Sequence, residues 1–253
     1  MTEDLNTPML HMRLPSRGSK ILRRITKMEV KKAWCFFEQS GTFRDSFIEL
    51  GIDSVCLDIK NEYGKTDIQI DLFAEIRKAY FDCDSIFDKI TKDDIVIAFF
   101  PCIRFTRRIE LEFKQSPLRY RTLAIDEKLL LAKQLEQERT DFYNLFCDLI
   151  LVCCKKHIRL IIENPYSIDH YLVRYFPIKA SIIDTNRRER GDYYGKPTQY
   201  WFINCLPSYN HNALFREQIM PKKRRVNDYP WGSKERSEIS PIYARQFIEE
   251  FIL

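Results

Sequence analysis

The feature that most constrains the fold is a series of short apolar segments, each followed by a polar turn and a stretch with helical spacing. DDIVIAFF, residues 93–100, is apolar on both faces of an extended chain and predicts a central buried strand. Segments 33–38 and 53–59 predict two further strands joined by the helix 44–51, which Gly51 closes. Such a strand-helix-strand unit favours a parallel sheet with a ligand at the carboxyl ends of the strands.

The rest of the chain extends this alternation. We expect an α/β protein with a Rossmann-like, mostly parallel sheet and helices on both faces. The further segments are an edge strand at 67–71, helices at 72–81 and 123–156, strands at 158–165, 179–184 and 199–204, and a terminal helix at 240–253. Ser240 is expected to cap that last helix, with Pro241 in its first turn.

The 253 residues are expected to form one core with additions at its ends. The predicted organisation is a basic N-terminal arm at 1–32, a catalytic core at 33–185, a reduced recognition region at 186–238 and a C-terminal helix at 239–253. The net charge of +5 permits a nucleic-acid partner without requiring one. The basic residues gather at 20–32, 104–108, 186–190 and 221–228, where a solvated surface is the competing interpretation for each segment.

Other whole-chain features exclude several classes of protein. No apolar run reaches membrane-spanning length and no secretory signal follows Met1, so we expect a soluble, cytoplasmic protein with no membrane association. The 8 cysteines show no CxxC pair or zinc-finger spacing, which predicts free thiols and no metal site.

Three of the predicted strand ends carry residues suited to chemistry. They are FFEQSGTF at 36–43, FFPC at 99–102 and IIENP at 161–165. Each alone is consistent with an ordinary strand end, but a parallel sheet places all three along one edge. The alternatives at this point are coincidental strand ends or a shared active site.

These segments resemble the DNA cytosine-C5 methyltransferases, in particular the small divergent members of phages and prophages. Pro101-Cys102 is similar to the family's catalytic dipeptide, residues 163–165 to its Glu-Asn-Pro, and 186–190 to its arginine motif. The resemblance implies S-adenosylmethionine as cofactor and DNA as partner. The cofactor-binding residues that it implies are Phe37, Ser40, Gly41, Thr42, Phe43, Asp58, Asp71 and Pro101.

The resemblance also implies roles for four residues in the reaction. Cys102 would add to cytosine C6 as a thiolate, and we expect neighbouring Arg104 to lower its pKa. Glu163 would neutralise charge at N3 of the ring. Arg188 and Arg190 would hold the DNA backbone around a flipped base.

The sequence departs from the family in ways that leave other functions open. Gln39 and Thr42 stand where the family has glycines, and Phe100 replaces a proline. One alternative is a catalytically degenerate module that binds nucleic acid or protein, and another is an enzyme that modifies pyrimidines in RNA or nucleotides. The short region 186–238 also raises the possibility that the arm, the loop KKRR at 222–225 or a protein partner supplies target recognition. The sequence does not specify the DNA site or the oligomeric state.

Overall fold

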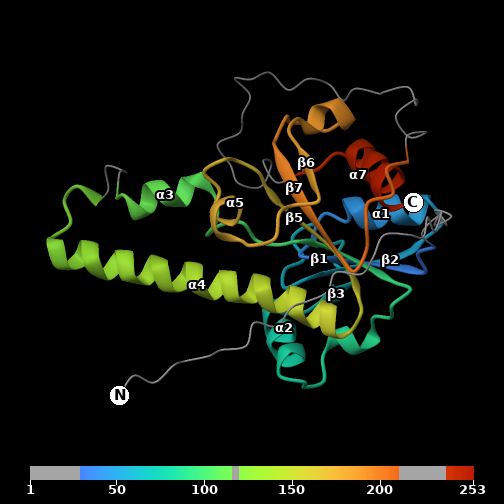
Figure 1. Ribbon diagram of the computed structural model, residues 1–253, viewed down its shortest axis with the longest axis horizontal. Coiled ribbons are helices and arrows are strands. Elements are labelled where there is room, and N and C mark those ends of the chain that lie inside the picture. Colours follow the sequence, from blue (N-terminus) through green and yellow to red (C-terminus); the bar gives the residue numbers. More distant parts are fainter. Residues whose placement is uncertain (1–28, 116–119, 211–237) are drawn as a thin grey trace, which may run out of the picture.

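A computed structural model describes residues 29–115, 120–210 and 238–253, and these form an α/β structure around a mixed sheet of seven strands (Figure 1). The spatial order of the strands is β3-β2-β1-β4-β5-β7-β6. Their bounds are β1 Lys32–Phe36, β2 Asp53–Asp58, β3 Ile68–Gln69, β4 Ile95–Phe99, β5 Arg159–Pro165, β6 Ile182–Asp184 and β7 Thr198–Ile203. Most of the predicted arm and the loop 222–225 lie outside the described residues.

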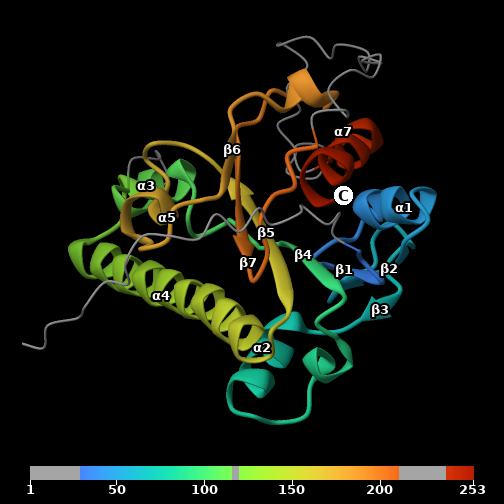
Figure 2. The ribbon, with the colours of Figure 1, turned by 45° about the vertical axis from the view of Figure 1, so that its right-hand side comes forward.

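Strand direction determines which ends of the chain meet at one edge of the sheet. The strands from β3 to β5 pair in parallel, whereas β7 pairs antiparallel with both β5 and β6. The carboxyl ends of β1, β2, β4 and β5 therefore share an edge with the amino end of β7 (Figure 2). The predicted mostly parallel sheet is confirmed, and the strand at 67–71 is indeed at its edge.

Helices cover both faces of the sheet, as expected. Helices α1 and α7 pack together on one face, and α2 packs against the long α4 on the other (Figures 1 and 2). The helical bounds are α1 Thr42–Glu49, α2 Leu72–Tyr80, η1 Ile86–Lys89, α3 Arg107–Phe113, α4 Ile125–Lys155, α5 Tyr171–Tyr175, η3 Arg187–Arg190, α7 Pro241–Phe247 and the π-helical turn η6 Ile248–Ile252. Across the described residues, no helix combines the length and apolarity needed to cross a bilayer.

The apolar residues divide into two cores because a sheet buried on both faces needs a partner layer on each. The first four residues of β4 are fully buried, as its continuous apolar sequence predicts. Alternate residues of β4 enter the two cores, with Val96 on the α2 and α4 side and Ile97 on the α1 and α7 side. Trp201 of β7 lies in the first core and Phe202 in the second, so neither presents a free face to a ligand.

The C-terminal helix returns to the start of the sheet. The Ser240 hydroxyl accepts a hydrogen bond from the Ile242 N–H at 3.2 Å, and Pro241 occupies the first turn, as predicted. The Phe247 ring lies 6.0 Å from that of Phe43 in α1 and 4.3 Å from that of Tyr200 in β7. The last helix thus closes the core beside the β1–α1 turn.

Candidate active site

The structure brings Cys102 and Glu163 to the same edge of the sheet. Cys102 is half-buried just after β4, and Glu163 is buried within β5, where its Cα pairs with that of Phe99. The Asn164 side-chain amide donates to the Phe100 carbonyl at 2.8 Å, which fastens the end of β5 to the chain before the cysteine. Two residues far apart in the sequence therefore face one site.

The electrostatics of Cys102 differ from the sequence-based expectation. Burial raises the pKa of the Cys102 thiol, Lys196 opposes that effect, and Glu163 adds to it. Arg104 instead forms an ion pair with Glu138 of α4. The prediction that Arg104 lowers the pKa of this thiol is therefore wrong, because α4 engages the guanidinium and the cation acting on the thiol comes from the segment before β7.

The two arginines assigned to DNA are held in different ways. Arg190 forms ion pairs with Asp184 at 3.1 Å and with Glu250 at 2.9 Å, so its guanidinium joins β6 to the C-terminal η6 turn. Arg188 is half-buried, and its Nε donates to the Tyr193 carbonyl at 3.3 Å. The structure thus separates Arg190, which holds the fold together, from Arg188, which lies against the loop leading to β7.

Arg187 is the arginine of this motif that reaches the interior beside Glu163. It is 2% exposed, forms an ion pair with Asp192, and lies 4.7 Å from the Tyr243 ring centroid. Burial lowers the pKa of Arg187, but neighbouring groups that include Tyr200, Asp192 and Glu163 more than reverse this and keep it a cation. The sequence pattern alone did not single out Arg187, because neighbouring arginines in one motif carry the same chemistry and only packing distinguishes them.

The turn between β1 and α1 contains several of the predicted cofactor-binding residues. Phe37 and Gly41 have positive φ angles of 58° and 68°, and a Cβ on Gly41 would lie 3.0 Å from Nη2 of Arg44. The Ser40 and Thr42 hydroxyls are 2.9 Å apart and hydrogen-bonded. Phe43, by contrast, is fully buried against Phe99 and Phe247, so its side chain belongs to the core.

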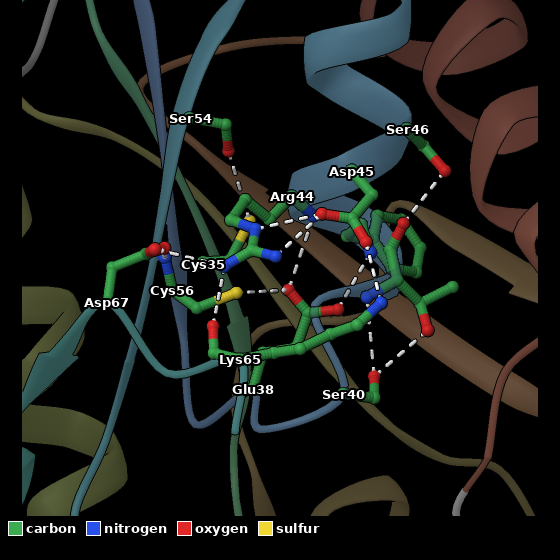
Figure 3. A network of polar contacts seen from close by, with 12 residues as sticks. Cys35, Glu38, Ser40, Arg44, Asp45, Ser46, Ser54, Cys56, Lys65 and Asp67 are labelled. Carbon is green, nitrogen blue, oxygen red and sulfur yellow. Dashed lines mark hydrogen bonds and ion pairs between the residues drawn. The ribbon is translucent and has the colours of Figure 1, made fainter. Parts of the chain in front are cut away.

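A buried carboxylate, Glu38, organises this turn (Figure 3). Its side chain accepts the backbone N–H groups of Phe43 at 2.7 Å and Arg44 at 3.4 Å, and the Cys56 thiol donates to it at 3.4 Å. Burial raises the pKa of Glu38, and the hydrogen bonds partly oppose that rise. Glu38 therefore caps α1 from inside the protein, a role that the sequence analysis did not assign.

Outside this cap, a charged network ties α1 to the segment before β3 (Figure 3). Arg44 donates to the Lys65 carbonyl at 2.5 Å and forms ion pairs with Asp45 and Asp67. Lys65 in turn contacts Asp45 at 2.9 Å, and the other Asp67 oxygen accepts the Cys56 N–H at 2.7 Å. The network holds the β1–α1 turn against the end of β2.

The remaining predicted cofactor ligands follow β2, β3 and β4. Asp58 ends β2 with 7% exposure, burial raises its pKa, and one of its oxygens accepts the Lys60 N–H at 2.8 Å. Asp71 is exposed and caps α2 by accepting the N–H groups of Phe73 and Ala74 at 3.0 and 3.2 Å. Pro101 is half-buried beside Cys102. Asp58 thus lies on the edge that also carries the thiol, whereas Asp71 supports a helix.

Comparisons with known proteins leave the family open. No family model matches the chain, and no curated protein matches its sequence. Among the residues that the structure describes, no group of three or more His, Cys, Asp or Glu side chains has an arrangement that could hold a metal ion.

Proposed function

We propose that the chain is an S-adenosylmethionine-dependent methyltransferase that acts on cytosine C5 in DNA through a covalent adduct at Cys102. The observation that carries the proposal is the juxtaposition of the half-buried Cys102 with the buried Glu163 at the edge where Asp58 also ends a strand. The mostly parallel sheet is compatible with a Rossmann-like fold, in which a ligand binds at the carboxyl ends of the strands. The basic segments of the chain supply positive charge for a DNA partner.

The residues at the first two strand ends fit the cofactor. Asp58 offers a carboxylate at the end of β2, where it would accept hydrogen bonds from ribose hydroxyls. Gly41 permits the positive φ angle of 68° at the β1–α1 turn, and the half-buried Phe37 directly follows β1 at the same edge. When bound, S-adenosylmethionine supplies the methyl group as an electrophile.

Cys102 provides the nucleophile that an unreactive pyrimidine ring requires. Its thiolate forms a bond to C6, which makes C5 electron-rich enough to take up a methyl group. Loss of the C5 proton and departure of the thiolate then restore the ring. The target base has to leave the duplex stack to reach a thiol at the edge of a sheet.

Glu163 neutralises the negative charge that this addition creates on the ring. As a carboxylic acid it donates a proton to N3 while the ring carries the adduct, and it accepts that proton again when the thiolate leaves. The buried cation Arg187 and Glu163 interact electrostatically in the interior beside this edge. Pairing of Glu163 with Tyr200 of β7 holds its backbone in place.

The test is incubation with S-adenosylmethionine and duplex DNA that contains 5-fluorocytosine, followed by denaturing electrophoresis and mass spectrometry. Fluorine cannot leave as a cation, so the adduct is expected to accumulate. We expect the adduct to be lost in Cys102→Ala and retained in Cys83→Ala, which removes an exposed free thiol. Absence of an adduct from protein that binds the cofactor would reject the proposed reaction on DNA.

One observation favours a second candidate, a binding module that retains the pocket without turnover. Glu38 already accepts two N–H groups at the start of α1, so these donors are not available to the carboxylate of a bound ligand. This candidate predicts that Cys102→Ala leaves DNA affinity unchanged in gel-shift titrations and that wild-type protein forms no adduct. A covalent adduct in the wild type would exclude it.

A further inference from the structure

We infer that Lys196 is the cation that favours the thiolate form of Cys102, an inference that rests on the proposed role of Cys102 as nucleophile. No role was assigned to Lys196 from the resemblance.

Because β7 runs antiparallel to β5, Lys196 lies at the edge of the sheet that carries Cys102. In a parallel strand, the residues before the first pairing position would lie at the opposite edge of the sheet from Cys102. Here Thr198 begins β7 opposite Pro165, the last residue of β5, and the Pro197 carbonyl accepts the Tyr166 N–H at 2.9 Å. Lys196 therefore stands at the carboxyl end of β5.

That end of β5 is fastened to the chain that carries the thiol. Asn164 donates to the Phe100 carbonyl, two residues before Cys102, and Glu163 is paired with Phe99. Both Cys102 and Lys196 are half-buried, so their charges are only partly screened by water. Cys102 after β4 and Lys196 before β7 thus lie at the same edge of the sheet, on either side of the carboxyl end of β5.

The segment before β7 is itself held in place. The Thr198 hydroxyl donates to the Lys196 carbonyl at 3.2 Å, and Arg188 donates to the Tyr193 carbonyl. Gly195 packs so closely on Asn186 that a Cβ there would lie 2.7 Å from its Oδ1 atom. The backbone that carries Lys196 is therefore held at this edge.

Three other cations near this edge, among the side chains that the structure describes, form ion pairs. Arg104 pairs with Glu138, Arg187 with Asp192, and Arg190 with Asp184 and Glu250. Within residues 29–115, 120–210 and 238–253, no ion pair involves the Lys196 ammonium group. Of the charged groups that act on the thiol, Lys196 favours its ionised form and Glu163 disfavours it. Without Lys196, only a backbone hydrogen bond would oppose the effects of burial and Glu163 on the thiol.

The experiment measures the pH dependence of Cys102 alkylation by iodoacetamide in the full chain, without DNA or cofactor. Trypsin releases residues 93–104, in which Cys102 is the sole cysteine, so mass spectrometry follows this thiol separately from the others. We expect Lys196→Met to raise the pH at which Cys102 alkylation reaches half its maximal rate by roughly half to one pH unit. Below this midpoint, alkylation would be roughly three- to tenfold slower than in the wild type. Lys196→Arg retains the charge and is expected to react like the wild type.

Lys179→Met removes an exposed lysine as the matched control, and thermal unfolding verifies that each variant is folded. An unchanged midpoint in Lys196→Met, or an equal rise in Lys179→Met, would overturn the inference. The 5-fluorocytosine adduct is assayed separately on the same proteins. A raised midpoint in Lys196→Met together with no adduct in the wild type would support the cation-thiol contact and reject the methyltransferase, so the two failures are distinguishable.

Discussion

Arg190→Ala provides the sharpest test of how the structure divides the arginines of residues 186–190. The wild-type side chain is 23% exposed and contacts Glu250, whose side chain is 8% exposed, through Nε at 2.9 Å and Nη2 at 3.3 Å. The substitution would leave that carboxylate buried without its guanidinium. Asp184, the second partner, keeps hydrogen bonds from the Tyr243 hydroxyl and the Asn186 N–H.

The expected loss follows from this geometry. Removing one member of a buried ion pair costs about 3 to 5 kcal/mol, and partial exposure of Arg190 reduces the expected cost to about 2 to 3 kcal/mol. In a chain of this size, such a loss lowers the midpoint of thermal unfolding by about 4 to 12 °C. Urea unfolding monitored by circular dichroism gives the free energy directly.

Two further variants test whether the unpaired buried charge of Glu250 causes the loss of stability in Arg190→Ala. The double substitution Arg190→Met with Glu250→Leu removes both members of the pair and is expected to recover most of the loss. Arg188→Ala, at a half-buried neighbour, is expected to cost less than about 1 kcal/mol. If Arg190→Ala keeps wild-type stability but loses DNA affinity, the arginine reaches DNA and the structural role described here is refuted.

Three other predictions concern Asp58 at the end of β2 and the two helix-capping residues Glu38 and Ser240. Glu38→Ala is expected to destabilise the fold by about 2 kcal/mol, because it uncaps α1 and leaves two N–H groups without their acceptor. Burial raises the pKa of Glu38 above the value that it has in the unfolded chain. Between these two pKa values the native state binds more protons than the unfolded state, so the free energy of unfolding falls as the pH rises through this range. Glu38→Gln has no carboxyl group to titrate, so the wild type should lose stability relative to this variant over the same range. If urea unfolding gave the same pH dependence of stability for the wild type and Glu38→Gln, the predicted titration of Glu38 would be contradicted. Asp58→Ala is expected to weaken S-adenosylmethionine binding about tenfold in calorimetry, equal to the loss of a charge-assisted hydrogen bond. Burial raises the pKa of Asp58. When the pH is lowered, the affinity of the wild type for S-adenosylmethionine should therefore begin to fall at a higher pH than it would with an exposed aspartate. Unchanged affinity in Asp58→Ala would show that Asp58 does not bind the cofactor. Ser240→Ala should cost about 1 kcal/mol through loss of the cap on α7, and a cost near zero would show that Pro241 suffices to start the helix.

Much of the architecture could be predicted because its signals are local. The apolar run at 93–100 is long enough to identify a central strand, and helical spacing through 123–156 identifies the long helix. Ser240 and Pro241 mark the start of the last helix through the chemistry of its first turn. Such features depend on residues within a few positions of one another, so no knowledge of the tertiary structure was needed.

The surroundings of the proposed cofactor-binding residues were harder to predict one by one. Phe43 and Asp71 match the expected positions in the sequence, yet one lies in the core and the other caps a helix. Glu38 carried no functional signal, although it is the carboxylate that organises the β1–α1 turn. Sequence spacing places a residue near a turn, but the packing around it decides which way the side chain faces.

The sequence by itself determined that strands end at Asp58, shortly before Cys102 and at the Glu-Asn-Pro segment, because strand periodicity and prolines are read along the chain. Only the tertiary structure decided which charges surround those ends. Arg104 pairs with α4, Arg187 enters the interior, and Lys196 lies at the edge that carries the thiol because β7 runs antiparallel. An apolar strand has the same pattern in either direction, so its direction, and with it the electrostatic environment of Cys102, comes from the packing of the whole sheet.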